Sequence, residues 1–83
     1  MKTISSRQNP LIKEINLLAN NPAERRKQFK TVLDGVHLVE AALAHGVVLE
    51  NVFVSEHGLR SVEIANLVDR LENQMSCILV TDN

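Results

Sequence analysis

The sequence predicts an α/β domain: a three-layer α/β/α arrangement around a small, mainly parallel sheet. Short apolar runs predict strands, and segments with apolar residues at helical spacing lie between them. The runs VFV and CILV do not alternate with polar residues, which is typical of strands covered on both faces in a parallel sheet. With 83 residues, the chain corresponds to one small domain.

The front of the chain predicts a polar arm and then a helix. Residues 1–8 show no helical pattern and are expected to form an extended or loosely ordered arm. Asn9 followed by Pro10 is typical of a helix start, because Asn accepts hydrogen bonds from unpaired backbone N–H groups and Pro suits the first helical position. Apolar residues at helical spacing continue this helix until Asn20 and Asn21.

A second, short helix is predicted over residues 22–28. Asn21 is again a good cap, and Glu24 follows three residues later, which is the spacing of a capping box. The segment has no apolar stripe, so its side chains are available to contact something outside the domain. It carries three successive cations: Arg25, Arg26 and Lys27.

The middle of the chain predicts a strand, a turn and a helix. Phe29–Leu33 is the expected strand, Asp34-Gly35 the turn, and Val36–Ala44 the helix, which ends at Gly46. Because a helix N-terminus carries unpaired N–H groups and about half a positive charge, the turn is a candidate phosphate site. The same unit also builds α/β domains that bind no anion.

Two more strands and one more helix are predicted in the second half. Val47–Ser55 and Cys77–Thr81 are the strands, and Ser61–Glu72 is an amphipathic helix between them. Successive strands separated by one helix favour parallel pairing through crossover connections. The inward face of the helix consists of Ile64, Leu67, Val68 and Leu71.

Charge is divided unevenly along the chain. Residues 1–35 hold seven basic and three acidic side chains, a net charge of +4, whereas residues 36–83 hold two basic and seven acidic ones, a net charge of −5. Such asymmetry indicates a face that binds a polyanion, although a solvated surface with segregated charges is an equally good interpretation. We expect the cations at the front to form one contiguous docking surface for a ribose-phosphate strand.

Several other classes of function are not supported. Phe29 and Phe53 are the only aromatic residues, so base stacking as in the common RNA-recognition sheet is nearly excluded. Cys77 is the only cysteine, which leaves no internal disulfide and predicts a reducing, cytoplasmic compartment. The sequence has no apolar run of membrane-spanning length and no metal-ligand spacing. We expect no catalytic centre, metal, cofactor or membrane partner for these residues.

One pattern of residues extends over the first half of the chain. It consists of Ser6, Asn9-Pro10-Leu11-Ile12-Lys13, Arg25, Asp34-Gly35, Leu38-Val39, Ala42-Leu43 and Gly46. In order and spacing it resembles the N-terminal substrate-binding domain of SpoU-type (TrmH-like) RNA 2′-O-ribose methyltransferases. The family usually has Phe-x-x-Glu-Gly at the strand end, where this chain has Thr31 and Asp34 before the Gly.

The resemblance implies a small α/β/α domain like the kink-turn-binding ribosomal proteins. It implies RNA (rRNA or tRNA) as the partner and presentation of that RNA to a catalytic domain of the same protein. That domain is knotted, binds S-adenosylmethionine, methylates the 2′-oxygen of ribose and usually dimerises. Residues 1–83 are therefore expected to be the N-terminal part of a longer RNA methyltransferase that can form a homodimer.

The predicted RNA-binding residues come from the family pattern and from charge. The pattern supports Asn9, Pro10, Arg25 and Gly35, although a helix start explains Asn9 and Pro10 at least equally well. Charge alone supports the other basic residues. We expect recognition by shape and backbone, and we expect replacement of Arg25 and Arg26 by Ala to weaken RNA binding without lowering the melting temperature. The full set is Arg7, Asn9, Lys13, Arg25, Arg26, Lys27 and Gly35.

Two other functions remain open from the sequence. A protein-interaction lobe would dock its 36–44 helix on a neighbour through an outer face at His37, Ala41 and Ala44. A stand-alone RNA binder like a ribosomal protein would work without any enzymatic domain.

Overall fold

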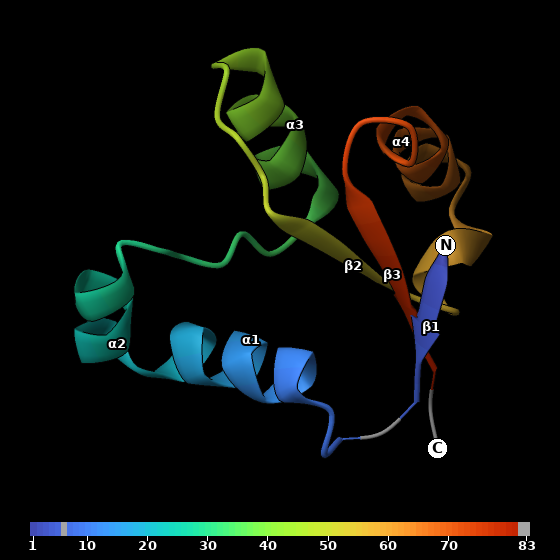
Figure 1. The fold of residues 1–83 in the computed structure, drawn as a ribbon. Coiled ribbons are helices and arrows are strands. Elements are labelled where there is room, and N and C mark those ends of the chain that lie inside the picture. The colour runs from blue at the N-terminus through green and yellow to red at the C-terminus, as the bar shows by residue number, and fades with distance from the viewer. Residues whose placement is uncertain (6, 82–83) are drawn as a thin grey trace.

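The structure is a computed structural model that describes residues 1–5 and 7–81 (Figure 1). Within these residues the strands form one parallel sheet of three strands, in the order β1-β3-β2. This confirms the predicted α/β class and its parallel sheet. The elements are β1 (Lys2–Ile4), α1 (Pro10–Asn20), α2 (Pro22–Gln28), α3 (Val36–Ala44), β2 (Asn51–Ser55), the 3₁₀ helix η1 (Gly58–Arg60), α4 (Val62–Leu71) and β3 (Ser76–Val80).

The helices begin and end where local sequence signals place them. Asn9 Oδ1 accepts a hydrogen bond from the Leu11 amide at 2.9 Å, and Ser61 Oγ accepts one from the Ile64 amide at 3.4 Å. Gly46 has a φ of +74° just after α3, the left-handed conformation that ends many helices. The predicted bounds of α2 and α3 are confirmed to the residue.

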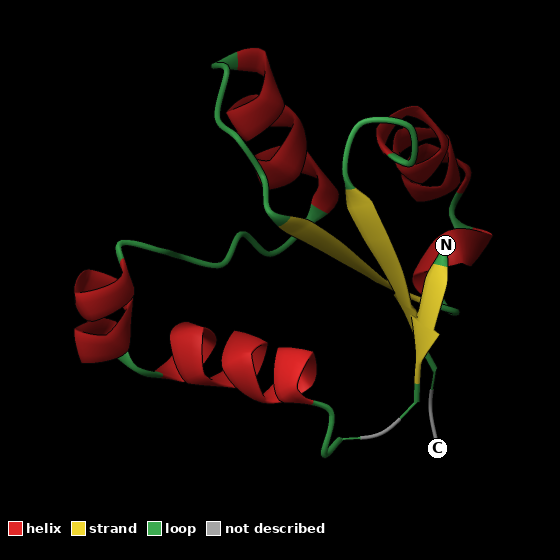
Figure 2. Cartoon of the chain, viewed as in Figure 1, coloured by secondary structure: helices red, strands yellow, loops and turns green. Residues whose placement is uncertain are grey.

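The sheet contains a different first strand from the one predicted. Lys2–Ile4 pairs in parallel with Ile78–Val80, so the start of the arm predicted over residues 1–8 is extended, and it belongs to the sheet. The prediction of a strand at Phe29–Leu33 is wrong, and Figure 2 shows an irregular segment there. Because β1 and β2 pair with the two edges of β3, the central strand is complete without residues 29–33. We call residues 29–35 the linker.

Two of the predicted strands shift at their ends. β2 begins at Asn51 rather than Val47, and β3 covers Ser76–Val80 rather than Cys77–Thr81. The hydrogen-bonded ladder between β2 and β3 begins where Asn51 pairs with Ser76. The predicted strand residues before Asn51 therefore have no residue of β3 to pair with. Strand length is therefore set by the neighbouring strand and not by the apolar run.

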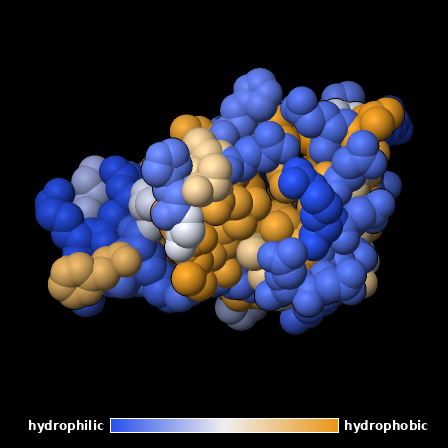
Figure 3. Space-filling view, turned by 90° about the horizontal axis from the view of Figure 1, so that it is seen from above, coloured by the Kyte–Doolittle hydropathy of each residue, from blue (hydrophilic) through white to orange (hydrophobic). Residues whose placement is uncertain are grey.

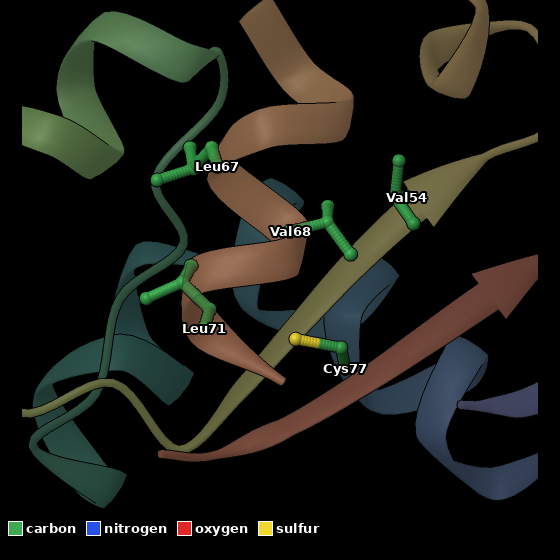
Figure 4. Close-up of a cluster of buried hydrophobic side chains, with 5 residues drawn as sticks. All are labelled: Val54, Leu67, Val68, Leu71 and Cys77. Carbon is green, nitrogen blue, oxygen red and sulfur yellow. The ribbon is translucent and has the colours of Figure 1, made fainter. Parts of the chain in front are cut away.

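The three layers come from alternation along the strands. Cys77 and Ile78 are neighbours on β3, so their side chains point to opposite faces, and both are buried. On the Cys77 face, α4 supplies Leu67, Val68 and Leu71 to a core that also includes Val54 (Figure 4). α1 lies on the other side of the sheet (Figures 1 and 4). The other buried residues of the domain, outside this core cluster, are Ile4, Leu18 and Ile78.

α3 contacts α4 through polar groups at its flank. His37 Nε2 lies 3.6 Å from Glu63 Oε1, and Arg70 Nη2 donates to Glu40 Oε1 at 3.3 Å. Both side chains reach the neighbouring helix but stay at the surface, since the side chain of His37 is 84% exposed and that of Glu40 is 42% exposed. Leu38 of the same helix is apolar and yet 54% exposed.

Candidate nucleic-acid interface

The predicted cationic site residues lie on one part of the molecule, which we call the helical arm (residues 7–28). The arm consists of the turn before α1, then α1 and α2, with α2 at its outer end away from the sheet (Figure 1). It carries five basic and two acidic side chains. Lys2, by contrast, lies on β1 across the molecule from α2 (Figure 1). The cations at the front of the chain are therefore not one contiguous surface, and the candidate interface is confined to the arm.

Local capping fixes the bend between α1 and α2. Asn21 donates its backbone N–H to Leu17 O at 2.9 Å, and its Oδ1 accepts from the amides of Ala23 and Glu24 at 3.0 and 3.2 Å. One residue thus closes the first helix and opens the second. The predicted capping box is only half formed, because the Glu24 carboxylate accepts from Gln28 Nε2 at 3.0 Å.

Arg25 serves the arm itself. Its Nη1 donates to Leu18 O at 2.7 Å and to Ala19 O at 3.2 Å, so the guanidinium covers carbonyl groups in the last turn of α1. A cation is favoured there, because the C-terminal carbonyls of a helix carry partial negative charge. We therefore expect loss of Arg25 to lower the melting temperature, unlike the expectation from the sequence for the joint replacement of Arg25 and Arg26.

Four other cations of the arm are exposed to solvent. In the part of the chain that the structure describes, no hydrogen bond or ion pair engages their charged groups. Each is thus available to a phosphate without first giving up a protein partner. These cations are Arg7, Lys13, Arg26 and Lys27.

Lys30 is a cation of a different kind. Its Nζ lies 3.1 Å from Glu50 Oε2 and 4.0 Å from Glu14 Oε1, so it joins the linker to α1 and to the segment before β2. The hydrogen bond and charge of Glu50, with a smaller effect of Glu14, raise the pKa of Lys30. Lys30 therefore holds the arm near the sheet and is not part of the candidate interface.

Asn9 and Gly35, the two uncharged members of the predicted set, have clear structural roles. Asn9 caps α1. Gly35 precedes α3 with φ +104° and ψ 150°, a backbone conformation that is essentially restricted to glycine. No atom lies within 4 Å of where its Cβ would be, so the requirement is conformational and not steric. RNA contact by either residue stays a prediction.

Phe29 was predicted from the sequence to begin a strand. It is the C-cap of α2, with a left-handed φ of +55°, and 94% of its surface is exposed. The one available signal was its position directly after the basic helix. The spacing of apolar residues does not predict the exposure of Phe29, because the residue that follows a helix belongs neither to a helical nor to a strand pattern.

An apolar groove of about 990 Å³ separates the arm from the sheet. Figure 3 shows apolar side chains gathered in a hollow between hydrophilic borders. Its walls come from α1, the linker and β2, including Leu11, Ile15, Leu18, Val32, Val52 and Val54. Such a lining does not suit a phosphate, so the groove is distinct from the cationic surface.

The described residues contain no group of three or more His, Cys, Asp or Glu side chains placed to hold a metal ion. Among the same residues, the search for a helix both long and apolar enough to cross a bilayer found none.

Comparison with known proteins gives one match. The family model described as the MRM3-like substrate binding domain matches residues 9–83, which begin at the cap of α1 and include every helix and two of the three strands. No curated protein and no solved structure matches the chain. The likeness to kink-turn-binding ribosomal proteins therefore stays a prediction.

Proposed function

We propose that this chain, which belongs to the family of MRM3-like substrate binding domains of SpoU/TrmH-like methyltransferases, binds RNA through the exposed cations of its helical arm. In this proposal, the domain holds an rRNA or tRNA segment for an S-adenosylmethionine-dependent 2′-O-ribose methyltransferase domain of the same protein. The chain's own residues supply binding and positioning, and the methyl transfer takes place elsewhere.

One observation carries the proposal: the outer helix of the arm presents cations that no protein group neutralises. Arg26 and Lys27 are exposed on α2, and none of the described acidic groups pairs with them. Phosphate contacts by such side chains release counterions and dominate affinity for nucleic acid. They carry little sequence information, so recognition through them depends on the shape of the RNA backbone.

A protein-interaction lobe is the second candidate, and exposed apolar residues favour it. On α3, Leu38 is 54% exposed, and Val48 after the same helix is 88% exposed. The outer face predicted for this function is exposed at all three of its residues, His37, Ala41 and Ala44, and His37 also approaches Glu63 of α4.

A charge-removal experiment tests the RNA proposal. The variant Arg26→Ala/Lys27→Ala is compared with the wild-type chain by fluorescence anisotropy on a labelled RNA stem-loop, over a salt titration. We expect weaker binding and a slope of log affinity against log salt that is smaller by up to about 1.4, since each phosphate contact on single-stranded RNA contributes about 0.7. The matched control is Arg60→Ala, an exposed cation on η1, which should leave both values unchanged.

Equal affinity and equal slope for the double variant and the wild-type chain would contradict the arm as the interface. If the wild-type chain shows no salt-dependent RNA binding, the protein-interaction lobe becomes the better interpretation.

A further inference from the structure

The exposure of Phe29 is unusual among the apolar residues of this domain. It has the largest exposed fraction of the exposed large hydrophobic side chains, at 94%, whereas Phe53 is half-buried in β2. An aromatic ring left in water loses the free energy that burial would give it. The ring therefore has a surface that a partner can cover.

The backbone holds this ring in a defined place. Phe29 donates its N–H to Arg25 O, and the Lys30 amide donates to the same oxygen at 3.1 Å. Lys30 is in turn fixed to Glu50 by its side chain. Two backbone hydrogen bonds to Arg25 O therefore tie the left-handed Phe29 to the end of α2, and an exposed ion pair follows at the next residue.

The surroundings of the ring are cationic. α2 ends one residue before Phe29, and its last turn contains Arg25, Arg26 and Lys27. An RNA base carries a flat π face, and the ribose to which it is attached is linked to a phosphate on either side. An exposed ring can stack on the base of a nucleotide, and the exposed guanidinium and ammonium groups that precede it in the sequence can contact the phosphates of the same nucleotide.

We propose that Phe29 is a stacking platform for one unpaired RNA base, with Arg26 and Lys27 at the neighbouring phosphates. The inference rests on the proposed RNA-binding function and narrows it: the arm selects a loop, bulge or single strand over a continuous duplex. Inside a duplex each base is already stacked on both sides, and only the end pairs leave a face open to the ring.

The alternative to base stacking is that the Phe29 ring binds in the protein's own apolar groove, since Phe29 is one of the residues that line it. Closure of the ring onto the groove would bury it in the absence of RNA. The two possibilities differ in the free protein: a stacking platform is exposed until RNA binds, whereas a groove anchor is already covered.

The experiment uses the absence of Trp and Tyr from the sequence. Phe29→Trp introduces one fluorophore, and its emission is followed while a single-stranded RNA oligonucleotide or a blunt RNA duplex of equal length is added at low salt. We expect solvent-exposed emission in the free protein, quenching by the single strand and little change with the duplex. Val62→Trp on α4, where the native side chain is 74% exposed, is the matched control and should not be quenched.

Affinity gives the second readout. Phe29→Leu keeps an apolar side chain but removes the ring, and we expect it to bind the single strand roughly 5- to 150-fold more weakly with an unchanged melting temperature. Emission of Phe29→Trp that is already blue-shifted in the free protein and insensitive to RNA would overturn the inference in favour of the groove.

The same data separate this inference from the proposed function. If Phe29→Leu binds like the wild-type chain while Arg26→Ala/Lys27→Ala binds more weakly, the stacking platform is refuted and phosphate binding by the arm stands. If neither variant changes the affinity, both proposals fail.

Discussion

Arg25, Arg26 and Lys27 follow one another on α2, and their side chains have different surroundings. Successive residues of a helix point about 100° apart, so three neighbours cannot share one face. Arg25 is turned back onto α1 and bonds Leu18 O and Ala19 O, whereas the other two extend into solvent. One basic run thus combines a structural cation with two cations available to a ligand.

At this scale we predict different stability effects for adjacent arginines. Arg25→Ala should lower the free energy of unfolding by about 1–2 kcal/mol, because charged hydrogen bonds to two carbonyl groups are lost. Arg26→Ala should change it by less than about 0.5 kcal/mol, as for other exposed surface positions. Urea denaturation followed by circular dichroism measures both, and equal values for the two variants would contradict the assignment of Arg25.

At the scale of elements, the linker shows why an apolar run did not become a strand. β3 is paired on both sides by β1 and β2, and residues 29–35 do not join the outer edge of either of these strands. Phe29 leaves α2 with a left-handed backbone, and Lys30 is held by Glu14 and Glu50. Residues 29–35 therefore connect the arm to α3 as an irregular segment.

For the linker, we predict the effect of replacing Gly35 on stability. Gly35→Ala should lower the free energy of unfolding by about 1–3 kcal/mol, since its φ and ψ are unfavourable for any residue with a Cβ. Thermal unfolding measures the loss, and Asp34→Ala, at an exposed neighbouring position, is the control that should have little effect. A melting temperature unchanged in Gly35→Ala would show that the backbone can leave this conformation at no cost.

At the scale of the whole molecule, the arm and the sheet are joined without closing completely. The radius of gyration is 12.9 Å, compared with about 11.8 Å for a compact domain of this length. The difference is consistent with the apolar groove between α1 and β2 and with the position of α2 at the outer end of the arm (Figure 1). The most buried part of the protein is therefore the sheet with α4, and the candidate interface lies on the part that projects from it.

The reactivity of Cys77 can be used to measure how often the core between the sheet and α4 opens. It lies in the core under α4, and burial, with a smaller effect of Glu72, raises the pKa of its thiol. We expect native Cys77 to react with a thiol reagent at pH 8 at least about 100-fold more slowly than in denaturant, because reaction requires opening of the core.

The same shift gives a pH dependence. The folded state binds the thiol proton more tightly than the unfolded chain, so this stabilisation is complete below the unfolded pKa of about 8.5 and is lost as the pH rises above it. The free energy of unfolding should therefore fall from pH 8 to pH 10 more steeply in the wild-type chain than in Cys77→Ala. Parallel curves for the two proteins would count against the assigned shift.

Much of the secondary structure and part of the candidate site could be predicted from local chemistry. Asn9 and Asn21 cap helices, and Gly46 ends one, because these roles need only hydrogen bonds and dihedral angles within a few residues. The amphipathic face of α4 is equally local, and so is the basic composition of α2. The sequence alone therefore determined the helices, the α/β class and the group of cations at the front of the chain.

The tertiary structure decided what depends on distant partners. Lys2–Ile4 becomes a strand only because Ile78–Val80, some seventy residues later, offers it an edge. Arg25 becomes structural because the end of α1 lies within its reach, and Phe29, at the end of α2, is left exposed. No local pattern contains these distances, and they determine which of the front cations, and which ring, a ligand can reach.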